Sequence, residues 1–395
     1  MRTTTENGKI TIYLEGRINT DNAANVEAEV LSIISEQKPG QELIFDAEKL
    51  EYISSAGLRV LMKVRKELGK AITITEVNRD VYDIFETTGF SDLFNVKRVL
   101  RKVSIEGCEK LGGAPNCEVY RLDRETIVKV YKGDLYTREK IEKNKELAKK
   151  IFTGGISTVI PFDMVKVGAH YGLVFEMMSG DSLANILSSH PEETEKYGKK
   201  VAGFIKKLHS TEFEPGILPD ASVPYIRSLK YLDEIGIFSS EETERVHELL
   251  RNIPHRNTFI HQNLNPINIM LMDDEFVLID VDDSGTGHPV WDLMGMYQVY
   301  INGAKAGWTK PMMGLGEDVL KPLWTTILHT YLGDEHSDDI PEVNRVLGGY
   351  TKMNQIIEMA TNPTIPGEIR KPTIEKEKAA FFDMIDTLYP VPRWI

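Results

Sequence analysis

The sequence is poor in the features of secreted and membrane-spanning proteins. Its 395 residues include only two cysteines, Cys108 and Cys117, too few for a framework of disulfides. No stretch approaches the roughly 18 unbroken apolar residues of a membrane span, and the first residues lack the apolar segment of a signal peptide. The nine histidines show no metal-ligand spacing. We therefore expect a cytoplasmic protein without a zinc site or a membrane segment.

Basic residues are also in deficit. The chain has 47 Lys and Arg against 60 Asp and Glu, a formal net charge of −13. Residues 1–105 contain 15 basic and 16 acidic residues, so nearly all of the excess negative charge lies in the remainder. Because an acidic surface repels phosphate backbones, we expect no nucleic-acid partner.

The first hundred residues alternate between strand and helix patterns. Short runs rich in Ile, Thr and aromatic residues predict strands, and apolar residues at helical spacing predict the intervening helices. The predicted strands are 10–14, 43–46 and 71–75, and the predicted helices are 23–35, 57–68 and 81–88. This alternation predicts a small α/β domain over residues 1–102, with helices packed on a sheet.

The pattern changes after residue 105. Residues 106–132 read as antiparallel strands, and 136–152 form one charged helical pattern followed by two more strands. From about residue 182 the chain is mostly helical, except for a loop and short strands at 259–283. This order predicts an α+β bilobal domain with a sheet lobe at 106–178 and a helical lobe at 179–395.

Two serines precede the second predicted helix, in Ser54-Ser55-Ala56-Gly57. Ser55 is a suitable N-cap for a helix that opens at Ala56, since its hydroxyl can accept from an unpaired amide. A phosphate on Ser55 would also face free N–H groups and the positive end of the helix dipole. The tetrapeptide alone fits a plain cap as well as a regulatory phosphosite.

The segments around these serines resemble one known family. LEGRINTDNAANV, LIFDAEKLEYISSAGLRVLMKVRKEL and ITITEVNRDVYDIFETTGFSDLF are similar to the STAS family of anti-sigma factor antagonists over about 100 residues. The resemblance implies that Ser55, two residues before Gly57, is the regulatory serine. Ser54 stands where the family usually has Asp. The resemblance also implies a regulatory partner protein of the anti-sigma type.

The second half contains the residue types that phosphoryl transfer needs. Gly112 and Gly113 lie in LGGAPNCEVY, predicted to be a glycine-containing turn between two strands, although it is not G-x-G-x-x-G. Lys129 lies on a β-branched strand, IVKVY. The following helix offers Glu142 and Glu146 on one face as partners for this lysine, of which we favour Glu142.

The most specific segment is FIHQNLNPINIMLMDDEFVLIDVDDSGTGHPVWDL, residues 259–293. It combines His261, a polar residue at 263, and Asn268 with an apolar strand that ends at Asp280. This spacing allows Asn268 and Asp280 to meet around one metal ion, with residue 263 facing the transferred phosphoryl group.

Residues 106–300 resemble the aminoglycoside and choline phosphotransferases, which are kinase-like proteins. The similarity extends to GLVFEMMSGDSL at 172–183, similar to the family's hinge, and to VAGFIKKLHS at 201–210. It implies a protein-kinase-like fold that uses ATP and Mg²⁺. The roles implied by position are Lys129 on the α- and β-phosphates, Glu142 paired with Lys129, Glu176–Met178 at adenine, Asn268 and Asp280 on Mg²⁺, and Asp292 and His261 as structural supports of the loop.

The chain departs from this family where a catalytic base is expected. The family loop reads His-Gly-Asp, and here it reads His261-Gln262-Asn263. A neutral amide cannot take the proton that a carboxylate accepts, and loss of a positioned base lowers the rate by roughly 10²–10⁴. We therefore expect a domain that binds Mg-nucleotide but turns it over slowly.

Three readings remain open at this stage. Asn263 is either native, in a pseudokinase that regulates a partner of the STAS domain, or an engineered Asp→Asn change in an active small-molecule kinase. A third reading is a kinase that phosphorylates the STAS serine, on the same chain or on another copy.

Overall fold

The computed structural model describes residues 1–395 except 7, 38–40, 363–364 and 389–395. The chain forms two compact units. The first contains Met1–Ser104 and Val165–Ala169, and the second contains Ile105–Met164 and His170–Ile395. In the described residues, no helix has the length and apolar character needed to cross a membrane.

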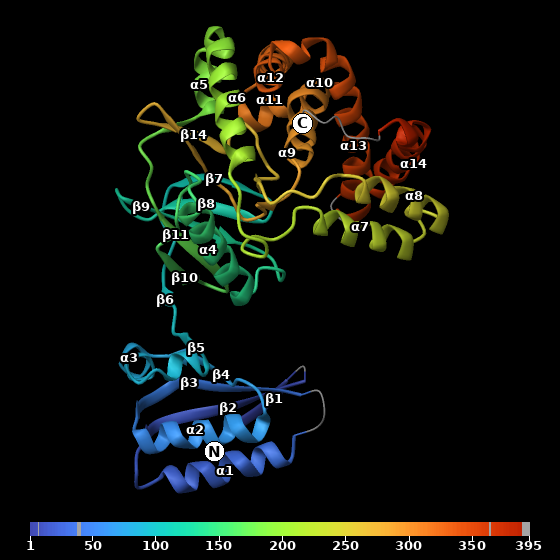
Figure 1. The fold of residues 1–395 in the computed structure, drawn as a ribbon. Helices are drawn as coiled ribbons and strands as arrows, with labels where there is room; N and C mark the ends of the chain where they lie inside the picture. Colours follow the sequence, from blue (N-terminus) through green and yellow to red (C-terminus); the bar gives the residue numbers. More distant parts are fainter. Residues whose placement is uncertain (7, 38–40, 363–364, 389–395) are drawn as a thin grey trace. The chain divides into compact units, whose positions relative to one another are not determined.

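The first unit is built around a five-stranded sheet of order β1-β2-β3-β4-β5. Strand β1 is antiparallel to β2, and the other neighbours are parallel. Helices α1 and α2 lie side by side on one face of the sheet (Figure 1). The elements are β1 (Thr3–Glu6), β2 (Lys9–Ile18), α1 (Ala23–Ser35), β3 (Glu42–Ile53), α2 (Ser55–Leu68), β4 (Thr73–Val77), α3 (Arg79–Thr87), a 3-10 turn (Phe90–Asp92), β5 (Asn95–Arg98) and β6 (Arg101–Lys102).

The predicted α/β layer is confirmed, but the predicted cap of its second helix is wrong. Helix α2 begins at Ser55, and Ser54 is the residue that caps it. The Ser54 hydroxyl oxygen accepts from the backbone N–H of Gly57 at 3.4 Å. Because Ser54 fills the capping position, the exposed hydroxyl of Ser55 is not used as a cap.

Gly57 allows α2 to pack closely on the sheet. A Cβ atom at this position would lie 2.7 Å from Ile18 Cγ2 and 2.7 Å from Ile53 Cγ1, and both isoleucines are buried.

We predict that Gly57→Ala lowers the free energy of unfolding of this unit by about 1–3 kcal/mol, the usual cost of overpacking. Hydrogen exchange of peptides covering residues 50–60 should become at least about fivefold faster. Arg59→Ala, on the exposed side of α2, is the control, and equal exchange in the two variants would contradict the prediction.

The second unit begins with a twisted sheet lobe. Its antiparallel strands are hydrogen-bonded in the order β11-β9-β8-β7. The elements of this lobe are β7 (Lys110–Ala114), β8 (Cys117–Arg121), β9 (Thr126–Tyr131), α4 (Arg138–Thr153), β10 (Asp163–Val167) and β11 (His170–Glu176). The predicted antiparallel strands and charged helix are therefore present.

The predicted glycine turn is not where we expected it. Gly112 and Gly113 lie inside β7, and the hairpin turns at Pro115-Asn116. A Cβ atom at Gly113 would lie 2.7 Å from the carbonyl oxygen of Cys117. The glycine is thus needed for the close approach of β8 rather than for the turn itself.

The helical lobe follows β11 and has a large apolar core that includes Phe259, Trp324 and Phe381. A three-stranded sheet of order β12-β14-β15 and a two-stranded sheet of β13 and β16 lie among its helices. Its helices are α5 (Leu183–Ser189), α6 (Thr194–Ser210), α7 (Val223–Glu234), α8 (Ser240–Arg251), α9 (Val290–Tyr297), a π-helix (Gln298–Gly303), α10 (Ala304–Ala306), α11 (Thr309–Met313), α12 (Glu317–Leu332), α13 (Ile340–Thr361) and α14 (Gly367–Met384), with 3-10 turns at Pro191–Glu193, Asp334–Asp339 and Ile385–Thr387. Its strands are β12 (Asp181–Ser182), β13 (Phe259–Ile260), β14 (Ile269–Met272), β15 (Glu275–Leu278) and β16 (Gly285–Thr286).

Candidate active site

The loop 261–268 connects β13 to β14, and Asp280 lies two residues after the end of β15. His261 is fully buried at the start of this loop. Its Nε2 donates to the carbonyl oxygen of Ile279 at 3.1 Å, and its Nδ1 accepts from the backbone N–H of Asn263 at 3.2 Å. The two contacts fix one tautomer of the imidazole. As the sequence indicated, His261 joins the loop to the segment that carries Asp280.

Asp292, in the first turn of α9, holds the backbone at the start of this loop. Its buried carboxylate accepts from the backbone N–H of His261 at 3.0 Å and of Gln262 at 2.6 Å. His209 Nε2, at the end of α6, donates to the same carboxylate at 3.1 Å, and His209 Nδ1 lies 2.8 Å from the hydroxyl of Tyr331 in α12. Three helices thus fix the backbone of the loop.

Two residues beside the site have left-handed backbones. Gln262 has φ = 65° and Asp280 has φ = 60°, a conformation that costs a side chain with a Cβ roughly 1–2 kcal/mol. The Gln262 side chain offsets part of this cost, since its Nε2 donates to the carbonyl oxygen of Asp283 at 2.8 Å. Gln262 therefore occupies a backbone shape that favours glycine.

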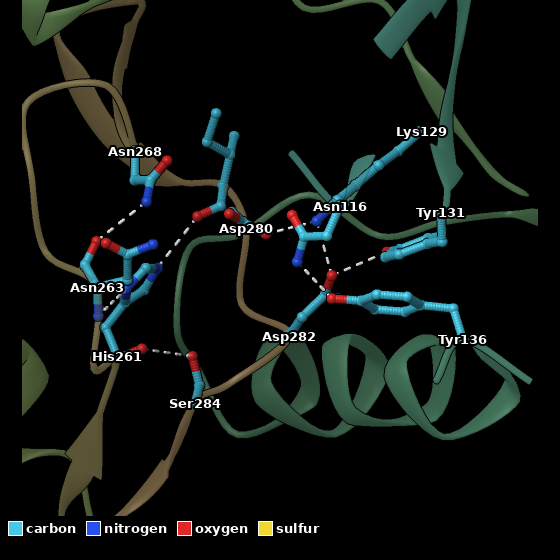
Figure 2. Close-up of polar contacts among 11 residues, drawn as sticks. Asn116, Lys129, Tyr131, Tyr136, His261, Asn263, Asn268, Asp280, Asp282 and Ser284 are labelled. Atoms are coloured by element: carbon cyan, nitrogen blue, oxygen red, sulfur yellow. Dashed lines mark hydrogen bonds and ion pairs between the residues drawn. The ribbon is translucent and has the colours of Figure 1, made fainter. Parts of the chain in front are cut away.

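Asn263 is exposed and oriented by its neighbours. Its Oδ1 accepts from Asn265 Nδ2 at 2.9 Å, and its carbonyl oxygen accepts from Asn268 Nδ2 at 3.0 Å. Figure 2 shows Asn263 and Asn268 beside His261, with Asp280 and Lys129 beyond them. Asn265 thus holds the side-chain amide of Asn263, and Asn268 holds its backbone.

Lys129 lies between two carboxylates. Its Nζ donates to Asp280 Oδ1 and, at 2.6 Å, to Asp282 Oδ2. Burial alone would lower the pKa of Lys129, but the nearby Tyr131, Asp282 and Asp280 raise it well above its ordinary value. The lysine is therefore a partly buried ammonium, 14% exposed.

The predicted pair of Lys129 with Glu142 is wrong. Glu142 accepts from Arg138 Nε at 2.8 Å, one turn earlier on α4. Lys129 instead contacts residues that follow β15, more than 150 positions away along the chain. An i, i+4 partner on the same helix is available to Glu142 whatever the tertiary fold, and this local pairing replaces the predicted one.

Two tyrosines complete the polar cluster around Lys129. The Tyr131 hydroxyl donates to Asp282 Oδ2 at 2.9 Å, and burial followed by the charge of Asp282 raises the pKa of Tyr131. The Tyr136 ring lies 5.3 Å from that of Tyr131, and its hydroxyl accepts from Asn116 at the turn of the β7–β8 hairpin. These contacts connect the hairpin to the Asp282 side of the site (Figure 2).

The remaining predicted residues lie where the sheet lobe joins the helical lobe. Glu176 is the last residue of β11, and the backbone N–H of Met177 donates to the carbonyl oxygen of Glu125 at 2.6 Å. Met178 follows in the connection to β12. The structure thus places 176–178 in the link between the two lobes.

Asn268 and Asp280 both offer the oxygen ligands that a magnesium ion prefers. Asn268 Nδ2 is engaged with Asn263, which leaves the amide oxygen as the ligand, and Asp280 contributes a carboxylate that is 39% exposed. Mg²⁺ prefers oxygen ligands and usually takes only one or two carboxylates from the protein, with phosphates and waters completing the shell. The described ranges contain no group of three or more His, Cys, Asp or Glu placed to hold a metal.

Sequence reasoning missed Asp282, Tyr131 and Tyr136. Strand alternation would have placed Tyr131 on the same face of β9 as Lys129, since the two are separated by two positions. Asp282 carried a weaker signal as one of three aspartates in IDVDD. Tyr136 carried none, because it lies in the loop before α4.

Comparison with known proteins gives a separate match for each half of the chain. Residues 1–103 match the STAS domain family. A Bordetella bronchiseptica protein named "Putative anti-sigma factor antagonist BtrV" is 35% identical over 92 residues, which cover 22% of this chain and 78% of that protein. The N-terminal domain is therefore a STAS domain of the anti-sigma factor antagonist type.

Residues 110–317 match the phosphotransferase enzyme family. Among solved structures, the ADP-bound aminoglycoside phosphotransferase APH(2'')-Ib aligns with a TM-score of 0.49 at 16% identity, covering 70% of this chain and 94% of that one. A choline/ethanolamine kinase family protein from Mesorhizobium loti aligns with a TM-score of 0.41 at 15% identity, covering 73% and 89%. Since the family model spans more than half of its residues, the chain belongs to the phosphotransferase enzyme family, with a STAS domain preceding the kinase-like fold.

Proposed function

We propose that this protein is a regulator whose phosphotransferase-like unit binds Mg-ATP with little turnover. The observation that carries the proposal is that Asn263 occupies the base position of an otherwise well-supported loop. Asp292 and His261 hold that loop through buried hydrogen bonds. The support of the loop is therefore present, and the group that would accept a proton is absent from position 263.

The geometry around Lys129 supports nucleotide binding. Lys129 is a partly buried ammonium on β9, next to Asp280 and Asp282, and an ammonium so placed is suited to nucleotide phosphates. Asn268 and Asp280 would hold Mg²⁺, which neutralises phosphate charge when it is bound. Residues 176–178 would present their backbone to adenine, and Gly112 and Gly113 would let β7 approach the phosphates closely.

The regulatory half of the proposal rests on the STAS domain. Its relative is named as an anti-sigma factor antagonist, and we infer that residues 1–103 dock a regulatory protein of the anti-sigma type. Ser55 stays the candidate phosphosite, since its hydroxyl is exposed at the start of α2. Nucleotide would bias this docking only if it bound the docked and undocked forms with different affinity.

The proposal predicts that Mg-ATP stabilises the second unit. At a ligand concentration of about 100 times Kd, binding adds about 2.7 kcal/mol to the stability of the folded state, which corresponds to a rise in the unfolding midpoint of roughly 5–10 °C. The measurement is a thermal-shift titration with Mg-ATP. Asp280→Asn is the control and should reduce the shift, because it removes the carboxylate proposed for Mg²⁺. A wild-type midpoint that does not move at millimolar Mg-ATP would contradict nucleotide binding.

The alternative is an active small-molecule phosphotransferase. It is favoured by the intact support of the loop through Asp292 and by the exposure of position 263 to an acceptor. Substantial ATP turnover by the present chain with a hydroxyl-bearing acceptor would establish this alternative.

A further inference from the structure

Lys129 contacts the carboxylate of Asp282, a residue that is far from it in the sequence. A lysine that contacts nucleotide phosphates must be held in place, and in protein kinases a glutamate from the helix after its strand does so. Here the corresponding glutamate, Glu142, accepts from Arg138. Lys129 Nζ instead lies 2.6 Å from Asp282 Oδ2.

Asp282 is itself fixed from a second direction. The buried hydroxyl of Tyr131 donates to the same Oδ2 atom at 2.9 Å. Tyr131 and Lys129 lie on one face of β9 because they are two positions apart. Asp282 Oδ2 therefore accepts hydrogen bonds from two side chains of β9. These contacts involve no residue of α4.

The two aspartates that contact Lys129 differ in exposure. Asp280 is 39% exposed, whereas Asp282 is 19% exposed. The more exposed carboxylate can turn toward a metal ion without breaking the contact between Lys129 and Asp282. The geometry thus separates the two carboxylates into a metal ligand and a lysine anchor.

We propose that Asp282 is the positioning residue that holds Lys129 for nucleotide binding in this chain, in place of a glutamate from α4. The inference deepens the proposed function and, for its nucleotide readout, rests on it. The expected consequence is that nucleotide affinity depends on Asp282 and Tyr131 but not on Glu142.

The first test compares Asp282→Asn with Glu142→Gln in full-length protein. We expect Asp282→Asn to raise the Kd for Mg-ATP by about tenfold or more, since truncating one member of a buried charge pair is costly. Glu142→Gln should leave Kd within about twofold, because the Glu142 carboxylate contacts Arg138 rather than Lys129. Tyr131→Phe, which removes one hydrogen bond to Asp282, should show a smaller change in the same direction as Asp282→Asn.

The second test needs no nucleotide. All four tryptophans lie after residue 290, so tryptophan fluorescence during urea unfolding reports on the second unit alone. A double-mutant cycle of Lys129→Met with Asp282→Asn should give a coupling of at least about fivefold in the unfolding equilibrium constant. The matched cycle of Lys129→Met with Glu142→Gln should give none.

The outcomes separate the two ideas. If wild-type protein fails to bind Mg-ATP while Lys129 and Asp282 are coupled, the proposed function falls and the anchoring role stands. Coupling of Lys129 to Glu142 in place of Asp282 would overturn the anchoring role. So would an Asp282→Asn variant that loses Mg²⁺ dependence without any coupling to Lys129, since Asp282 would then be a metal ligand.

Discussion

Replacing Asn263 with aspartate should raise ATP turnover by roughly 10²–10⁴, the usual contribution of a positioned general base. The surroundings of residue 263 already suit a carboxylate. Asn265 Nδ2 donates to Asn263 Oδ1 at 2.9 Å, and an aspartate would accept that bond at one oxygen and keep the other for an acceptor hydroxyl or water. The measurement is ADP release at saturating Mg-ATP, for the present chain and for Asn263→Asp.

Two further variants control this experiment. Asn263→Ala should turn ATP over no faster than the present chain, since neither residue can take a proton. Asn263→Asp combined with Asp280→Asn should lose the gain, because the carboxylate proposed for Mg²⁺ is removed. Equal and substantial turnover by the present chain and by the Asn263→Asp variant would show that residue 263 is not the base and would end this account of the site.

Removing the Asp292 carboxylate should cost the second unit about 3–5 kcal/mol of unfolding free energy, because each buried donor left without its acceptor costs about 1–3 kcal/mol. Asp292→Ala would leave the backbone N–H groups of His261 and Gln262 and the imidazole of His209 without their acceptor. Asp292 and His261 are both fully buried. Water could therefore replace the carboxylate only by entering the packed interior. Urea unfolding followed by tryptophan fluorescence measures the loss.

The matched control for Asp292→Ala is Tyr331→Phe, at the far end of the same hydrogen-bond chain. It removes only the hydroxyl that contacts His209 Nδ1, and we expect a loss of about 1 kcal/mol. Similar losses for the two variants would mean that Asp292 does not brace the loop. Asp292→Ala should also abolish nucleotide binding, while Tyr331→Phe should retain most of it.

Local periodicity in the sequence was enough to predict most elements of the fold. The helix expected at 23–35 is α1, Ala23–Ser35, and that expected at 136–152 is α4, Arg138–Thr153. Apolar spacing marks such elements because each buries one face. Their ends were less predictable: Ser55 was the predicted cap of α2, but Ser54 has the extended backbone of a capping residue and caps the helix.

The partner of Lys129 could not be predicted in the same way. Glu142 is close in sequence, so it was the natural choice, but it has Arg138 on its own helix. Asp282 reaches Lys129 only because β15 and β9 are brought together by the fold. Contacts over such separations leave no periodic signal, and the same holds for the bond between Asn116 and Tyr136.

The double contact of Lys129 has a thermodynamic consequence for ligand binding. The ammonium has three N–H donors, two of which contact Asp280 and Asp282, and a divalent cation would compete with Lys129 for the charge of Asp280. A nucleotide that draws Lys129 toward its phosphates thus releases Asp280, and a cation on Asp280 frees the lysine. By linkage, each ligand raises the affinity for the other by the same factor, so the protein would sense the complex of nucleotide and metal rather than either one alone.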